Sequence, residues 1–359
     1  MIIFNVLNVR KLSKIDFLSE NFQFILQKKN QTNQNTMEVI SGNPSTTKKI
    51  KYYGKGSEFA IVYFKNIILT LLTLGLYYPW AKVEILKYHY QSSELDDARF
   101  QFHATGMEVF RGFIKIYVIL ILLYVYLLFG IQSQSEVMTI TAASLFYLFF
   151  ILIIPLAIHG AVRYRASRSS WKGIHFKYTG SKKELFLVYI KGVLLTIFTL
   201  GIYSAWLQVD IRKYVLSKLK FGNVSFNFHG SGGQLLWINI KLVLLFYITL
   251  GIYSFWYYKN LWRFYIDNTS VTQNGERIYL SFKMKAGDVF ELLVVNFFLI
   301  AFTLGLATPW VAVRTINFFF RFSELEGYVD TNAIEQSTYD DYDDATGDDF
   351  LDFLDFDLL

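Results

Sequence analysis

The sequence has no cysteine among its 359 residues, which excludes disulfide bonds and thiolate metal sites. Charge is also scarce, because only 18% of the residues are Asp, Glu, Lys or Arg. Soluble domains rarely combine so little charge with 35 Phe and 25 Tyr. Composition therefore favours a membrane protein over a soluble domain.

Motifs that carry common enzyme chemistry are missing as well. The sequence contains no GxxxxGK phosphate loop, no HExxH pair and no GxSxG nucleophile elbow. Its carboxylates lie at predicted helix starts or in the C-terminal tail, and no basic soluble face suits a nucleic acid. We therefore expect neither an enzyme nor a nucleic-acid-binding protein, and we predict no cofactor or metal.

One phrase, by contrast, occurs four times. The copies are TLGLYYPW ending at Trp80, TLGIYSAW at Trp206, TLGIYSFW at Trp256 and TLGLATPW at Trp310. Each closes an apolar run of about 20 residues, long enough to cross a bilayer. The repetition predicts repeated membrane-embedded units.

The runs predict an α-helical integral membrane protein with about six transmembrane helices in repeated units, joined by short amphipathic helices. The expected spans are 59–78, 109–130, 137–160, 185–203, 235–253 and 289–307. Lys and Arg divide equally between the two sides, so the positive-inside rule assigns no orientation. Either the repeats are inverted, or each unit crosses an even number of times. In the second case the apolar run is re-entrant, or the amphipathic helix after the elbow packs back through the bundle. We favour six spans.

The repeated phrase predicts a helix–turn–helix elbow at the membrane boundary. Its glycine suits a helix end because glycine tolerates positive φ, and a proline after it suits the start of the next helix. The elbow residues are Gly75, Pro79, Trp80, Gly201, Trp206, Gly251, Trp256, Gly305, Pro309 and Trp310.

Basic residues recur at two places in the units. One set lies seven residues after an acidic residue or Gln at the helix start, and comprises Lys65, Lys115, Lys191 and Lys241. The other follows the elbow beside an aromatic residue, and comprises Lys87, Arg163, Lys213 and Arg263. These side chains either snorkel to the headgroups within an ordinary aromatic belt or converge on an anionic lipid or solute.

Alternating segments precede the apolar runs, among them RFQFHATG and VSFNFHGSGG. Period-two alternation bounded by Gly predicts strands, which we expect to form small β-hairpins or a small sheet at the membrane surface. His103 and His229 occupy matching places in two of them, but no third metal ligand accompanies them.

The ends of the chain differ from its middle. We predict a polar, weakly ordered arm over 1–51, a repeated membrane domain over 52–324 and an acidic disordered tail over 325–359. The arm is either a real amphipathic segment or lies upstream of a functional start at Met37. The tail has 12 acidic residues and no Lys or Arg, so it docks on a protein partner, folds back on basic loops or stays solvated.

The segment TLGLYYPWAKVEILKYHYQSSELDDARFQFHATG (73–106) resembles the YjgN-like family of bacterial inner-membrane proteins, a domain of unknown function (DUF898). The resemblance extends over about residues 52–324. It is carried by Gly75, Pro79, Trp80 and Lys87 and by later copies of the phrase, with Ala205 and Phe255 departing from the proline. It implies a multi-pass protein of the bacterial cytoplasmic (inner) membrane and nothing about catalysis.

Two functions remain open from the sequence. One is a lipid-interacting or scaffolding membrane protein whose basic residues contact anionic lipids. The alternative is a transporter or permease-like protein for a small, anionic solute, with Lys115, Lys191 and Lys241 lining a polar path. We favour the first, because polar groups deep in the predicted spans are scarce.

Overall fold

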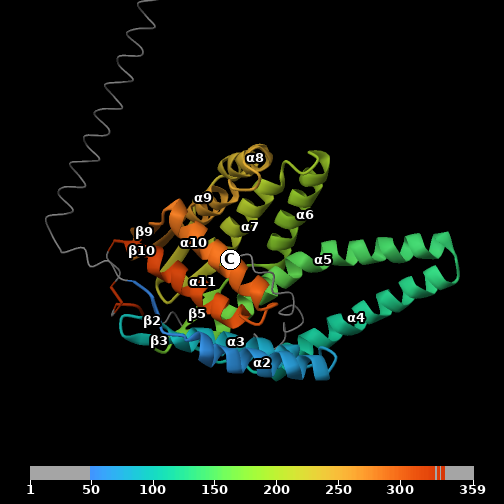
Figure 1. Ribbon diagram of the computed structural model, residues 1–359, viewed down its shortest axis with the longest axis horizontal. Coiled ribbons are helices and arrows are strands. Elements are labelled where there is room, and N and C mark those ends of the chain that lie inside the picture. Colours follow the sequence, from blue (N-terminus) through green and yellow to red (C-terminus); the bar gives the residue numbers. More distant parts are fainter. Residues whose placement is uncertain (1–48, 328–329, 332, 336–359) are drawn as a thin grey trace, which may run out of the picture. The chain divides into compact units, whose positions relative to one another are not determined.

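The computed structural model describes residues 49–327, 330–331 and 333–335 (Figure 1). All described residues belong to one compact unit, Thr47–Leu359. The arm predicted over 1–51, including Met37, therefore lies almost wholly outside the described residues. So does the acidic tail beyond residue 335.

Pairs of helices alternate with strands along this unit. The apolar runs form first helices, and polar caps define where several of them start. Thr105 and Glu108 form a capping box, in which the Thr105 hydroxyl accepts from the Glu108 N–H at 3.4 Å. The first helices are α2 (Gly56–Leu72), α4 (Gly106–Gln132), α6 (Lys182–Phe198), α8 (Gly232–Ile248) and α10 (Ala286–Phe302). The second helices are α3 (Tyr78–Ser92), α5 (Glu136–Arg168), α7 (Ser204–Lys218), α9 (Ser254–Asp267) and α11 (Thr308–Phe322).

The repeated phrase forms the same elbow at all four sites. At the first site, Leu74 and Gly75 are both left-handed, with φ of 51° and 92°, and the Gly75 N–H donates to Thr70 O at 2.7 Å. Thr73 Oγ1 accepts from the Tyr77 N–H at 2.9 Å and thereby bridges the two helices. The left-handed glycine expected from the sequence is confirmed, as are the prolines at the starts of α3 and α11. Contacts between Lys55 and Tyr88 show that α3 runs back along α2.

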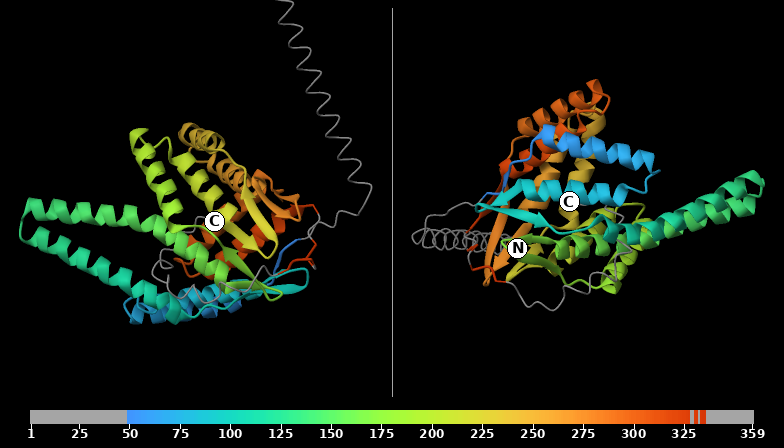
Figure 2. Two further views of the ribbon diagram at one scale, coloured as in Figure 1. Left: turned by 180° about the vertical axis from the view of Figure 1, so that it is seen from behind. Right: turned by 90° about the horizontal axis from the view of Figure 1, so that it is seen from below.

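The expected six spanning helices are not found. Among the described residues, two helices are long and apolar enough to cross a membrane, α4 with 27 residues and α5 with 33. Their hairpin projects beyond the others (Figures 1 and 2). The remaining first helices have 17 residues each, about 25 Å at 1.5 Å per residue. Four of the six expected runs included an elbow, where the chain reverses, and the other two, 109–130 and 137–160, lie within α4 and α5.

The strands form one sheet rather than small separate hairpins. Its ten strands lie in sequence order, and every neighbouring pair is antiparallel. They are β1 (Lys51–Tyr52), β2 (Ser93–Leu95), β3 (Ala98–Phe102), β4 (Ser169–Trp171), β5 (Ile174–Tyr178), β6 (Leu219–Phe221), β7 (Val224–Phe228), β8 (Thr269–Gln273), β9 (Glu276–Phe282) and β10 (Ser323–Glu326). Strands on either side of a helical hairpin can pair because each hairpin returns the chain to the sheet.

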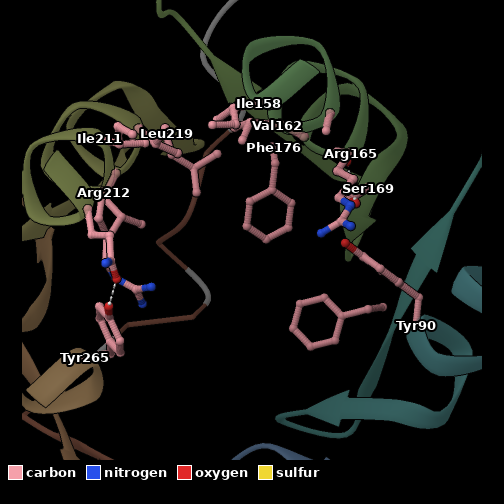
Figure 3. A pocket seen from close by; sticks show the side chains of 16 residues that line it. Tyr90, Ile158, Val162, Arg165, Ser169, Phe176, Ile211, Arg212, Leu219 and Tyr265 are labelled. Carbon is pink, nitrogen blue, oxygen red and sulfur yellow. Dashed lines mark hydrogen bonds between the residues drawn. The ribbon is translucent and has the colours of Figure 1, made fainter. Parts of the chain in front are cut away.

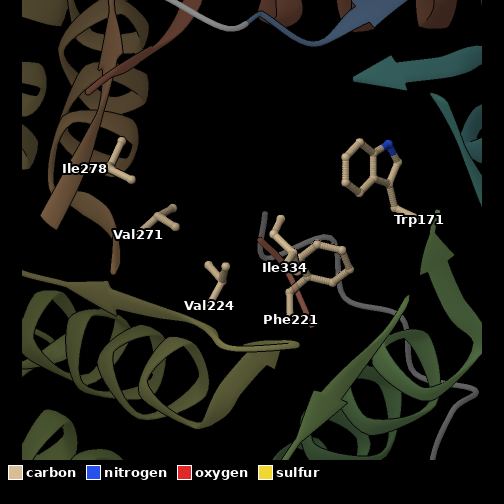
Figure 4. Packing of buried hydrophobic residues seen from close by; sticks show 6 residues of the cluster. All are labelled: Trp171, Phe221, Val224, Val271, Ile278 and Ile334. Carbon is tan, nitrogen blue, oxygen red and sulfur yellow. The ribbon is translucent and has the colours of Figure 1, made fainter. Parts of the chain in front are cut away.

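The sheet curls around a shared apolar interior (Figure 4). Side chains from β4, β6, β7, β8 and β9 pack in a single buried cluster, with partly buried residues from β2, β3, β5 and β10 against it. The cluster consists of Trp171, Phe221, Val224, Val271, Ile278 and Ile334. Near the two edge strands, Lys49 Nζ lies 2.6 Å from Glu324 Oε1. The curvature therefore brings the first and last strands towards each other.

The folded unit continues past residue 324, where we expected the acidic tail to begin. β10 extends to Glu326, and Ile334 is buried in the interior cluster. The Gln273 side chain bonds both backbone groups of Asp330, at 2.9 and 3.0 Å. The first part of the predicted tail thus covers the apolar interior at the end of the sheet where β8 turns into β9.

Contacts between tryptophan and glycine join successive units. A Cβ on Gly106 would lie 2.2 Å from a ring atom of Trp80, and one on Gly232 would lie 2.3 Å from Trp206. The last unit meets the first in the same way, because a Cβ on Gly56 would lie 2.3 Å from Trp310. Since α11 also packs against α2, the hairpins form a closed ring.

The neighbouring glycines of α8 provide a matched test of this contact. We expect Gly232→Ala to lower the free energy of unfolding by about 1–3 kcal/mol, because the new methyl group overlaps the Trp206 ring. Gly233→Ala meets nothing within 4 Å and should be neutral or slightly stabilising. Unfolding of both variants in detergent measures the difference, and equal effects would show that the contact does not matter.

A half-buried histidine, His89, lies beside the junction of the last and first units. The His89 ring centre is 4.6 Å from that of Phe59, and Tyr52 Oη lies 2.7 Å from His89 Nδ1. Burial, reinforced by the nearby charge of Lys82, lowers the pKa of His89 to about 4. The neutral imidazole is therefore the form that this junction accommodates.

Acid should therefore weaken the junction. The unfolded chain binds a proton near pH 6.5, whereas folded His89 resists it down to about pH 4. This contribution to stability is complete above pH 6.5 and falls as pH drops towards 4, by about 2 kcal/mol at pH 5. His89→Gln keeps an acceptor for Tyr52, so comparing the unfolding of both proteins at pH 7 and pH 5 isolates the effect. An identical pH dependence in the two proteins would contradict it.

Candidate functional site

The lysines predicted within the apolar runs do not converge. Lys65 forms an ion pair with Glu84 on the returning helix α3. Lys241 Nζ lies 5.2 Å from the ring centre of Trp237 on its own helix. Lys115 on α4 and Lys191 on α6 are exposed. These lysines lie on the first helices of four different hairpins.

The basic residues that follow the elbows are also dispersed. Lys213 is exposed, Lys87 and Arg163 are half-buried, and Arg263 pairs with Asp267 at 3.6 Å. The aromatic residue beside each basic one has a structural role instead. The Tyr88 hydroxyl accepts from the Lys55 N–H and donates to the Lys55 carbonyl, both at 2.9 Å. It thereby fastens the start of the first helix to the end of the second.

Tyr214 repeats this arrangement at Ser181, with distances of 2.7 Å to the N–H and 3.0 Å to the carbonyl. The two histidines of the alternating segments also have structural partners. His103 Nε2 lies 2.8 Å from Ser170 Oγ, and His229 Nε2 lies 2.8 Å from Ser270 Oγ. Each of these contacts joins neighbouring strands of the sheet.

A cavity of about 420 Å³ lies where the helices meet the sheet (Figure 3). The inner faces of α5 and α7 form most of its wall, and residues of α3, α9, β3, β4, β5 and β6 complete it. The wall is mainly aliphatic and aromatic. Its polar side chains are Tyr90, Arg165, Ser169, Gln208, Arg212 and Tyr265. Neither set of basic residues predicted from the sequence contributes to it.

The two arginines lie on opposite sides of this cavity (Figure 3). The Arg212 guanidinium carbon lies 4.6 Å from the ring centre of Tyr265 and 5.3 Å from that of Phe228, both within cation–π range. Tyr265 in turn donates to Gln208 Oε1 at 3.3 Å. Burial lowers the pKa of Arg212, but a guanidinium remains charged at neutral pH.

Sequence reasoning missed both arginines, although it identified their neighbours Arg163 and Lys213. A signal was present in the repeats. Arg212 lies six residues after Trp206, the elbow tryptophan of the α6–α7 unit. At the same distance from their own elbow tryptophans, the other units have the apolar residues Leu86, Trp262 and Ile316. Departures of this kind mark positions where one unit differs from the shared scaffold. The helix face that the arginine occupies, however, depends on how the hairpins pack.

Comparison with known proteins assigns the chain to a family. Residues 47–227 and 257–353 match the family described as "Bacterial protein of unknown function (DUF898)". This match extends beyond residue 324, where we expected the resemblance to end. No solved structure matches the chain.

Two curated relatives are each named "Inner membrane protein YjgN". The protein of Salmonella typhimurium is 29% identical over 146 residues, which are 41% of this chain and 35% of the relative. The Escherichia coli K12 protein is 28% identical over 152 residues, 42% of this chain and 36% of the relative. The similarity thus spans about a third of the length of these relatives. With most of its length matched by the family, the chain belongs to the DUF898 family of bacterial proteins of unknown function.

Proposed function

We propose that the protein is a non-enzymatic, lipid-interacting scaffold of the bacterial inner membrane that inserts its helical hairpins into the bilayer. The observation that carries this proposal is the surface of the elbows. Each elbow exposes a left-handed leucine almost completely, with exposed fractions of 82% for Leu74, 95% for Leu200, 91% for Leu250 and 94% for Leu304. Exposed apolar tips of this kind suit hydrocarbon better than water.

Polarity differs between the two ends of the hairpins. Large apolar side chains are exposed along α2, α6, α8 and α10 towards their elbows. The sheet end carries ion pairs, including Lys172 with Asp96 at 3.5 Å and Lys283 with Glu324 at 2.9 Å. This division supports an orientation with the elbows in lipid and the sheet in water. The names of the relatives support the inner membrane as the location.

The short hairpins would then enter and leave the membrane on one side. Their first helices, about 25 Å long, are shorter than the roughly 30 Å hydrocarbon core. Among the described helices, only the α4–α5 hairpin would reach the far side, where its polar turn around Ser133 meets water. Such re-entry gives each unit an even number of crossings, the alternative to inverted repeats that the tie of Lys and Arg between the two sides left open.

Exposed Lys115 and Lys191 support contact with lipid headgroups. Each lies about 10 Å along its helix from the acidic residue at the helix start. A cation at that depth can snorkel to the interface and attract anionic lipid. The alternative of a transporter lined by these lysines is less favoured, because neither contributes to the cavity between α5 and α7.

Single-cysteine labelling tests this orientation directly, since the natural chain has no cysteine. We expect Leu200→Cys and Leu250→Cys to resist a water-soluble maleimide in native membranes and to place an attached fluorophore in lipid. Asn223→Cys, at an exposed turn of the sheet, should react from one side only, and Ser133→Cys from the other. Rapid labelling of the elbow cysteines from water would contradict insertion.

A further inference from the structure

We propose that the cavity between α5 and α7 binds an anionic amphiphile. Its acidic head would lie between Arg165 and Arg212, and its hydrocarbon chain would lie against the apolar wall. This inference adds a specific ligand site to the proposed membrane scaffold. It depends on the interior of the ring and not on the elbows.

The size and chemistry of the wall favour a hydrocarbon portion. A volume of about 420 Å³ falls within the roughly 300–1,000 Å³ typical of small-molecule pockets. Ile158, Val162 and Ile211 from the helices face Phe176 from the sheet across this space. An inorganic anion alone would leave that apolar surface uncovered, whereas an acyl chain would bury against it.

The charged groups favour an acidic head. Among the sixteen described residues that line the cavity, two are arginines and none is Asp or Glu. Guanidinium groups bind carboxylate and phosphate oxygens through paired N–H donors. The Arg212 guanidinium carbon lies 4.6 Å from the Tyr265 ring centre, and a guanidinium group carries five N–H donors with which it can also bind an oxyanion. The hydroxyls of Tyr90 and Tyr265 provide further polar groups in the same wall.

The repeats indicate that these arginines are not needed to build the ring. At the position of Arg212 the other units have Leu86, Val162, Trp262 and Ile316. At the position of Arg165, ten residues after Pro155, they have His89, Val215, Tyr265 and Phe319. The same hairpin forms with uncharged side chains at both places. The hairpin fold therefore does not require arginine at either place.

Native mass spectrometry of the full chain, released from membranes in mild detergent, tests this proposal. We expect the natural protein to retain an anionic lipid and the double variant Arg165→Gln/Arg212→Gln to lose it. The loss of two charge-assisted contacts should weaken binding on the order of tenfold to a hundredfold. Lys213→Gln removes a similar charge from an exposed neighbouring position on α7 and should retain the lipid.

A second variant addresses the chance that the double variant fails to fold. Ala161→Phe fills the cavity from α5 while keeping both arginines, and it should also lose the lipid. Retention of the same lipid by both Ala161→Phe and the double variant would overturn the proposal. So would a natural protein that binds no anionic lipid even when it is added.

Thermal unfolding with defined additives distinguishes the sources of the ligand. Stabilisation by phosphatidylglycerol indicates a membrane phospholipid, and stabilisation by oleate alone indicates a free fatty acid; either supports the proposal. Equal stabilisation by phosphatidylcholine, or by inorganic phosphate without a chain, would overturn it. Because elbow labelling reports insertion and not cavity occupancy, failure of this site and failure of the proposed membrane orientation can be told apart.

Discussion

The constraint on which the structure depends is the reversal of the chain at each elbow. Two consecutive left-handed residues, such as Leu74 and Gly75, end one helix and direct the next back along it. The threonine before them caps this turn by accepting the backbone N–H of the residue that precedes the second helix. Without this reversal the chain would continue in one direction, and the strands of successive units would lie at opposite ends of the helices.

Reversal makes the sheet possible, and the sheet in turn closes the ring. Each hairpin delivers its following strands to the same end of the molecule, where ten short strands pair in sequence order. Strands of two to seven residues form little sheet individually, but together they curl around one interior that contains Trp171. The contact of Trp310 with Gly56 then joins the last unit to the first. Packing between units thus supplies the closure that no single unit contains.

The repeated and unrepeated residues have different roles. Elbow glycines recur in the four units that contain the repeated phrase, tryptophans that pack on helix starts recur in three of these units, and tyrosines that bind the N-cap backbone recur in two. Arg165 and Arg212 occur once each and meet at one cavity. The repeated residues of the ring can hold the two arginines in place at the proposed ligand site, because the ring forms in the other units without arginine at these positions.

Sequence patterns were sufficient for features that depend on a few adjacent residues. The left-handed elbow glycines, the prolines that begin α3 and α11, and the strands before the apolar runs follow from local backbone preferences. The number of membrane-spanning helices could not be predicted in this way, because hydropathy measures how apolar a run is and not whether the chain turns within it. The lysines predicted within the apolar runs lie on four different hairpins. A spacing of seven residues places two residues on one face of the same helix, but it does not predict how that helix lies relative to the next helix.

The sequence by itself determined the repeating unit, because φ preferences, caps and alternation act within about ten residues. Only the tertiary structure decided that the units close into a ring, that their strands form one curled sheet and that Arg165 faces Arg212 across a cavity. These features depend on which face each helix turns towards its neighbours. That choice is made by packing between residues far apart in the chain, such as Trp310 and Gly56.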